Sequence, residues 1–253
     1  MEAIRGNAGH AKLDAVVDAS TRRRGLAIAV WRFIAGAPLT YSWLTALLVT
    51  TIVKENFLTK RQLHTLVVDD SSTNIKNIVY LAWDTPAVLM DSLLWIDGRY
   101  WTPYLVLFTL FLAPAEHWLG QLRWLTVGFT SHVVATYISE GILYAAIRHH
   151  DAPRRLMHAA DIGVSYFLVG VMAVLTYHIA RPWRWGYLGI LFLIFGVLLI
   201  ATDRHGLNFT AIGHFTSILI GLCFYPMARK RHHPQWNPAT LKAAFRRATG
   251  AGA

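Results

Sequence analysis

Two polar side chains lie inside long apolar segments of this chain, and their types suit nucleophilic chemistry. Ser165 ends the run Asp161-Ile-Gly-Val-Ser, and His214 directly follows Ala-Ile-Gly. A serine hydroxyl becomes a nucleophile when a histidine within hydrogen-bond reach accepts its proton. The pair predicts a serine nucleophile and its base, and it favours peptide-bond hydrolysis within a membrane.

The two residues fall at similar depth if both segments enter the membrane from the same side. Ser165 is four residues beyond Asp161, about 6 Å at the rise of a helix. His214 is seven residues beyond Leu207, about 10 Å by the same rise. Because helix boundaries vary by a residue or two, both side chains are expected in one layer below the outer surface.

Small residues on the same two segments predict close helix packing. The second segment carries Gly213, Ser217 and Gly221 at spacings of four, and the first carries Gly163 and Gly170. Faces of small residues let membrane helices approach backbone to backbone. We therefore expect the two segments to pack against each other.

The composition is that of a membrane protein. The 253 residues are 55% hydrophobic and 15% charged, and the mean hydropathy is +0.38. The net charge of +10 comes from Lys and Arg that flank apolar blocks, which favours topology determinants over nucleic-acid binding. Cys223 is the one cysteine, so an intramolecular disulfide is excluded.

Six apolar blocks are long enough to cross a bilayer as helices, which takes about 17–25 residues. They cover residues 33–53, 101–115 with a few flanking residues, 122–147, 161–180, 184–202 and 207–228. Five spans with a re-entrant segment are the alternative. The predicted fold is an all-α membrane protein made of a cytoplasmic segment 1–30, a six-helix membrane domain 31–228 and a basic cytoplasmic tail 229–253.

Basic residues give the orientation. An even number of spans puts both ends on one side, and that side holds fifteen of the 24 Lys and Arg residues. It is therefore the cytoplasmic side, with a bacterial plasma membrane as the expected location. The connection 54–100 then lies outside. Its part 77–95 is apolar but interrupted by Asp84, Pro86 and Asp91, which predicts short helices in the outer interface.

Other polar residues within the blocks have several interpretations. His132 is a rival base or an interhelical hydrogen bonder, and Glu140 lies in the same block without a predicted role. Asp161 is a candidate cap for the helix that carries Ser165. The run His149-His150-Asp151 reads as a solvated loop rather than a metal site.

Three motifs together resemble the rhomboid intramembrane serine proteases over residues 30–228. Gly163-Val-Ser165-Tyr166 resembles their Gly-x-Ser-Gly element at the start of the fourth helix. The run from His214 through Ser217 to Gly221 is similar to His-x-x-Gly-x-x-x-Gly in their sixth helix. The run Glu116-His-Trp-Leu-Gly-Gln-Leu-Arg123 looks like the end of their second helix. The resemblance implies a rhomboid-like bundle with an interfacial first loop, which cleaves single transmembrane helices without a metal or organic cofactor.

The sequence also departs from the family pattern. The His-x-x-x-Asn element that helps bind the oxyanion is missing, and Tyr100 and Tyr104 stand roughly at its place as candidate donors. Tyr166 replaces a glycine, and Val169 replaces the aromatic residue that stacks on the family's histidine. These changes keep a second hypothesis open, in which the chain is an inactive pseudoprotease that binds transmembrane clients in the lipid bilayer.

Overall fold

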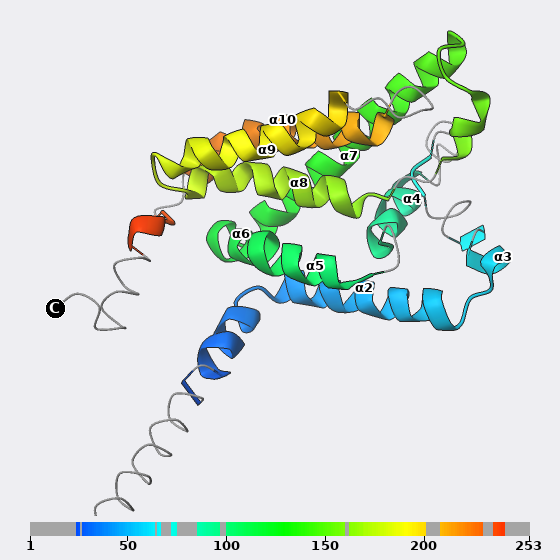
Figure 1. The fold of residues 1–253 in the computed structure, drawn as a ribbon. Helices are drawn as coiled ribbons and strands as arrows, with labels where there is room; N and C mark the ends of the chain where they lie inside the picture. Colours follow the sequence, from blue (N-terminus) through cyan, green and yellow to red (C-terminus); the bar gives the residue numbers. More distant parts are fainter. Residues whose placement is uncertain are drawn as a thin grey trace, which may run out of the picture.

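A computed structural model describes residues 24–25, 27–63, 65–66, 72–74, 85–96, 100–159, 162–200, 208–229 and 235–240. Within these residues the fold is all-α, as predicted, and the one strand-like feature is an isolated bridge between Ile179 and Trp236 (Figure 1). Asp161 lies outside the described residues.

Helix α8, Val164–Leu175, is the centre of the fold and continues into the 3₁₀ turn η6, Thr176–His178. It packs between α7, Gln121–Arg148, and α10, Phe209–Cys223, which also contact each other. Every residue of α8 from Tyr166 to Leu175 is buried. A helix that is apolar on all sides is expected in such a position, because no side of it favours water.

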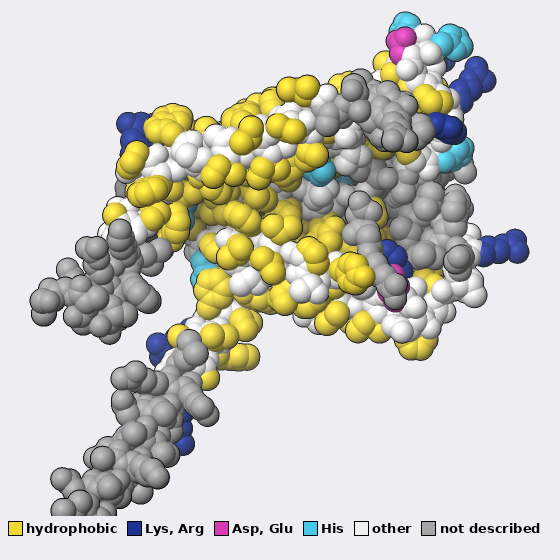
Figure 2. All heavy atoms as spheres, in the orientation of Figure 1, with side chains coloured by type: hydrophobic (Ala, Val, Ile, Leu, Met, Phe, Trp, Pro, Cys, Tyr) yellow, Lys and Arg dark blue, Asp and Glu magenta, His cyan; other side chains and the backbone are white. Residues whose placement is uncertain are grey.

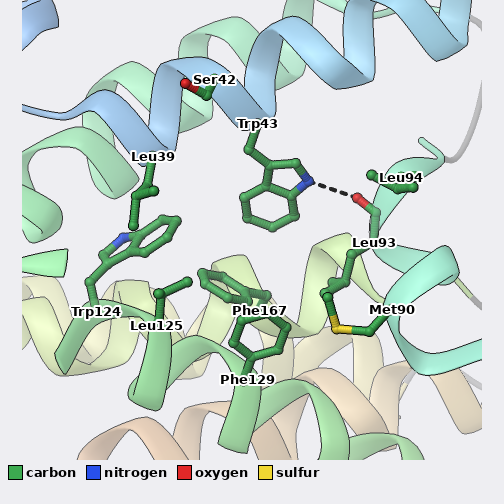
Figure 3. A pocket seen from close by; sticks show the side chains of 10 residues that line it. All are labelled: Leu39, Ser42, Trp43, Met90, Leu93, Leu94, Trp124, Leu125, Phe129 and Phe167. Carbon is green, nitrogen blue, oxygen red and sulfur yellow. Dashed lines mark hydrogen bonds between the residues drawn. The ribbon is translucent and has the colours of Figure 1, made fainter. Parts of the chain in front are cut away.

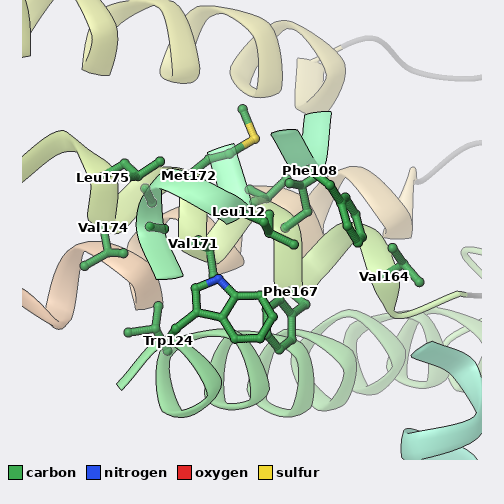
Figure 4. Packing of buried hydrophobic residues seen from close by; sticks show 14 of the residues in the cluster. Phe108, Leu112, Trp124, Val164, Phe167, Val171, Met172, Val174 and Leu175 are labelled. Atoms are coloured by element: carbon green, nitrogen blue, oxygen red, sulfur yellow. The ribbon is translucent and has the colours of Figure 1, made fainter. Parts of the chain in front are cut away.

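Helix α2, Pro38–Asn56, and a broken helix lie along the other side of this core (Figure 1). The broken helix consists of α5, Thr102–Leu107, the π-helical turn η4, Phe108–Leu112, and α6, Ala113–Leu119. It ends at Gly120, whose φ of 80° lies in the left-handed region that glycine adopts without a Cβ clash. Phe108 and Leu112 face Trp124 and Phe167 in the core (Figure 4).

The segment 85–96 forms α4, Thr85–Asp91, and the 3₁₀ turn η3, Ser92–Leu94. Short helices were predicted over residues 77–95, and they are found over 85–94, whereas 77–84 lie outside the described residues. The C-terminal end of this segment is hydrogen-bonded to α2. The Trp43 indole N–H donates to the Leu93 carbonyl at 2.7 Å, and the Thr50 hydroxyl donates to the Leu94 carbonyl at 2.7 Å. Leu93 and Ile96 are buried, so the segment packs into the bundle as well as covering it.

Among the described residues, only α9, Trp183–Ile200, is by itself long and apolar enough to cross a membrane. Helix Ala27–Ala35 and α2 together pass the same test, but the chain bends by 90° between them. The α8–η6 helix and α10 are apolar but shorter. The first apolar block was expected to begin at residue 33, whereas α2 begins at Pro38 because the chain turns at Gly36.

Helix α9 is largely exposed, and Leu191 is its one buried residue. Its outward side chains are large and apolar, and Figure 2 shows hydrophobic groups gathered over this part of the bundle. The Tyr187 hydroxyl holds one end of α9 by donating to the Met172 carbonyl of α8 at 2.8 Å. Such a surface suits contact with lipid tails rather than with water.

Candidate functional site

Ser165 lies in the first turn of α8. Gly163 is the N-cap residue and has no side chain to cap the turn; Asp161, the candidate cap, lies outside the described residues. The Ser165 hydroxyl is half-buried and donates to the Ile162 carbonyl through a long hydrogen bond of 3.4 Å. Ser165 therefore lies at the positive end of the α8 dipole.

His214 lies in the second turn of α10 with its ring between two aromatic side chains. The ring of Tyr166 from α8 meets it edge-on, at a centroid distance of 5.2 Å and an angle of 75°. The ring of Phe195 from α9 lies 5.4 Å away at 51°. The turn is fixed by Asn208, whose side-chain oxygen accepts the Ala211 N–H at 3.0 Å.

Tyr166 is fully buried and packs on Gly213, the residue before the histidine. A Cβ at Gly213 would collide with the phenol ring, so this tyrosine fits because residue 213 has no side chain. The same ring contacts His214. Tyr166 therefore joins the helix of the candidate nucleophile to the helix of the candidate base.

Ser165 and His214 come to the same end of the bundle, in the first turn of α8 and the second turn of α10. No hydrogen bond joins them among the described residues, because the serine hydroxyl is directed to Ile162. A change of the Ser165 rotamer is the smallest movement that redirects this hydroxyl.

His132 of α7 is completely buried beside the turn that carries Ser165. Its Nε2 donates to the Leu89 carbonyl at 2.9 Å, which fixes the tautomer, and Ser92 Oγ lies 3.3 Å from the same nitrogen. Gly163 lies directly against the imidazole, and a Cβ there would collide with it. His132 thus joins the segment 85–96 to the start of α8 and makes an interhelical hydrogen bond, which is one of the two roles expected for it. The sequence did not identify its partner, because that partner is a backbone carbonyl.

The remaining small residues also mark helix contacts. Gly170 lies against Ser131 of α7, and the Ser217 carbonyl of α10 is also near. Gly221 lies against the Gly170 carbonyl, and the Ser217 hydroxyl donates to the Gly213 carbonyl at 2.9 Å. The small residues of α8 thus face α7 as well as α10.

The two tyrosines considered as oxyanion donors lie at the start of the broken helix. Tyr100 precedes α5 and is 71% exposed. Tyr104 is half-buried in α5 and meets the Phe108 ring edge-on at 6.3 Å. No group of three or more His, Cys, Asp or Glu residues in the described part of the chain is arranged to hold a metal ion.

Glu116 has a structural partner that its motif did not reveal. Its carboxylate is buried in α6 and accepts the N–H groups of Leu39 and Thr40, at 3.0 and 2.8 Å, and the Thr40 hydroxyl at 2.7 Å. These donors belong to the first turn of α2, which lacks a cap of its own. Glu116 therefore caps a helix that is 76 positions away in the sequence.

A mostly apolar cavity of about 280 Å³ lies between α2, the segment 85–96, α7 and α8 (Figure 3). Trp43, Met90, Leu125 and Phe167 point into it from these four elements (Figure 3). Neither Ser165 nor His214 lines it. The cavity suits an aliphatic or aromatic side chain and offers almost no polar group for chemistry.

A family described as "Rhomboid-like protein" matches residues 32–234. The match spans most of the chain and includes all three motifs, and it confirms the family predicted from them. Neither a curated protein nor a solved structure shows significant similarity to the chain.

Proposed function

Because the chain belongs to the rhomboid-like family, we propose that it is an intramembrane serine protease in which Ser165 and His214 form the catalytic dyad. The observation that carries the proposal is their common position at one end of the bundle, linked by the Tyr166 ring. The family in general comprises such proteases. The substrates we propose are single transmembrane helices that unwind near their outer ends.

The proposed reaction moves two protons, one in each half, through His214. Ser165 Oγ attacks the scissile carbonyl carbon while His214 accepts the hydroxyl proton. His214 then gives this proton to the leaving amine. Water attacks the resulting ester of Ser165 while His214 accepts a proton from the water, and His214 gives that proton to Ser165 Oγ as the carboxyl product leaves.

The oxyanion of this reaction forms beside the N-terminal end of α8. The Ser165 N–H belongs to the first turn of this helix, where amide groups and the helix dipole favour negative charge. Tyr104 or Tyr100 is the proposed second donor. Loss of one such donor lowers the rate by about 10²–10³.

The arrangement in the membrane is part of the proposal. Six helical stretches fall on the six predicted blocks: α2, α5 through α6, α7, α8 with η6, α9 and α10. We propose that all six cross a plasma membrane, with the segment 1–30 and the tail 229–253 in the cytoplasm. The outward apolar side chains of α9 support this placement.

A second candidate function is the capture of transmembrane clients without cleavage. The Ser165 hydroxyl bonds to its own helix turn, and the apolar cavity beside Trp43 and Phe167 suits a side chain of a bound helix. In this alternative Tyr166 occupies the space that the proteases leave to a glycine.

Labelling by a fluorophosphonate probe and cleavage of a reporter transmembrane helix test the proposal together. We expect the purified protein to be labelled and to cleave, and Ser165→Ala and His214→Ala each to abolish cleavage. The double variant should be no worse than either single one, because the two groups act as a unit. Ser139→Ala is the matched control, since this buried serine of α7 bonds only to the Thr136 carbonyl among described groups.

Cleavage that persists in Ser165→Ala excludes the dyad. Absence of both labelling and cleavage in the unaltered protein, together with client binding that survives both substitutions, favours the pseudoprotease.

A further inference from the structure

The bend before α2 is held by two consecutive residues of α6. Glu116 caps the start of α2, as described above, and His117 binds the end of the preceding helix Ala27–Ala35. His117 Nε2 donates to the Phe33 carbonyl at 2.9 Å, and the imidazole stacks on the Phe33 ring with centroids 5.2 Å apart. The 90° angle is therefore fixed from both sides.

Gly36 makes this joint possible. It lies directly against the His117 ring, where a Cβ would collide with the imidazole. Its N–H donates to the Arg32 carbonyl at 3.0 Å, which closes the last turn of the helix before the chain changes direction.

The helix Ala27–Ala35 exposes large apolar side chains. Ile28, Val30 and Trp31 are 52, 50 and 68% exposed, and none of the other described residues covers them. Figure 2 shows hydrophobic and basic groups together on this projecting helix. An exposed apolar helix surface is expected to contact lipid or another protein, because contact between water and large apolar groups is unfavourable.

The arginines lie toward one part of the helix surface. Arg24 and Arg32 are eight residues apart, which places them about 80° from each other around the helix axis. By the same spacing Val30 and Phe33 lie on the opposite side, whereas Ile28 falls between the two arginines and Trp31 lies close to Arg24. The sequence adds Arg22 and Arg23 immediately before the helix. An apolar side beside a row of arginines is the pattern of helices that lie in the headgroup region of anionic membranes.

We propose that the helix Ala27–Ala35, with Arg24 just before it, is a surface helix that binds anionic phospholipid at the membrane face where α2 begins. Because α2 crosses the bilayer in the proposed topology, the 90° bend lays this helix parallel to the membrane plane. Val30 and Phe33 enter the boundary between headgroups and tails, Trp31 lies at the headgroup level beside Arg24, and Arg24 and Arg32 bind headgroup phosphates. The inference holds for a protease and for a pseudoprotease alike.

A nitroxide label at Val30→Cys, in a Cys223→Ala background, tests this in reconstituted bilayers. With phosphatidylglycerol present we expect the label to be accessible to oxygen and protected from a water-soluble nickel reagent. Each of Arg24→Gln and Arg32→Gln should lower the ratio of membrane-protected to water-accessible label about fivefold. Arg154→Gln is the matched control, because this exposed arginine lies beyond the far end of α7.

Three results would overturn the proposal. The first is a label open to the nickel reagent in both kinds of bilayer. The second is immersion that is equal with and without phosphatidylglycerol, which leaves the arginines no role. The third is spin–spin broadening that grows with protein density, which identifies a second copy as the covering partner.

Discussion

Tyr166 and Gly213 are a matched pair of unusual residues at the candidate site. The rhomboid pattern has glycine where this chain has Tyr166, and an aromatic residue one turn after the serine where this chain has Val169. In the structure the phenol ring occupies the space above Gly213 and contacts the His214 ring. The aromatic contact to the histidine is thus made from a different position of the same helix.

Gly213→Ala should destabilise the protein by about 1–3 kcal/mol, because the added methyl collides with a buried ring. Thermal or denaturant unfolding in detergent measures this. In a Tyr166→Leu background, Gly213→Ala should destabilise the protein much less, because the smaller side chain leaves room for the methyl group. The effects of the two substitutions on stability are therefore strongly non-additive.

Gly189→Ala is the matched control for that prediction. Gly189 lies in α9 with open space where its Cβ would be, and alanine is the better helix former by about 1 kcal/mol. This change should be neutral or slightly stabilising. Equal stability of the two alanine variants would contradict the proposed collision.

The positions of Ser165 and His214 near the starts of their segments predicted that both lie at the same end of the bundle, because each helical residue adds a fixed rise along the helix axis. It did not reveal the contact between Tyr166 and His214. Which side chains meet across two helices depends on the rotation of each about its axis, and a single sequence with small residues on several sides of α8 does not fix that rotation.

At the scale of elements, helix ends are held by side chains from distant parts of the sequence. Glu116 caps α2, and His132 binds the backbone of the segment 85–96. Both residues are buried, so their hydrogen bonds face little competition from water. These two contacts set the positions of α2 and the segment 85–96 relative to the core.

Glu116→Ala should destabilise the protein by about 3–5 kcal/mol, since it leaves buried donors of Leu39 and Thr40 without their acceptor. Glu116→Gln should cost roughly half of that, because the amide keeps one acceptor but turns an N–H₂ toward the other donor. Unfolding midpoints in detergent measure both changes.

Asp151→Ala, a change of the same charge at an exposed loop position, should alter stability by no more than about 0.5 kcal/mol. A Glu116→Ala variant as stable as this control would show that water replaces the carboxylate at the start of α2.

Apolar periodicity and length predicted the helical stretches well. In an apolar environment the backbone N–H and C=O groups of a segment must hydrogen-bond to one another, which favours a helix. Periodicity and length did not predict the bend at Gly36. Residues 33–53 were expected to form one apolar block, although Gly36 and Pro38 within it mark the position where one helix ends and α2 begins. The angle of the bend depends on Glu116 and His117 from another helix, which the local sequence does not show.

At the scale of the whole molecule, the sequence divides its charge unequally between the two predicted sides. The side that holds both termini and the starts of α2 and α7 carries fifteen of the 24 Lys and Arg residues, and the proposed topology puts it in the cytoplasm. The candidate serine then lies in the outer half of the membrane.

Cysteine labelling checks this orientation. In a Cys223→Ala background, Phe57→Cys lies beyond the end of α2 at a residue that is 74% exposed, and it should react with an impermeant maleimide from outside the cell. Gln235→Cys, which is exposed in the C-terminal segment, should react only after the membrane is opened. The reverse pattern would invert the topology and move the site to the cytoplasmic half.

The pairing of Tyr166 with Gly213 also restricts the order in which such a sequence can arise. A tyrosine entering at 166 opposite an alanine or larger residue meets a collision, whereas a glycine entering first at 213 leaves a space that the ring later fills. The change to glycine at position 213 should therefore precede the change to tyrosine at position 166 during evolution. Relatives with tyrosine after the serine are expected to carry glycine before the histidine, and a lineage with that glycine alone is a plausible ancestor of this site.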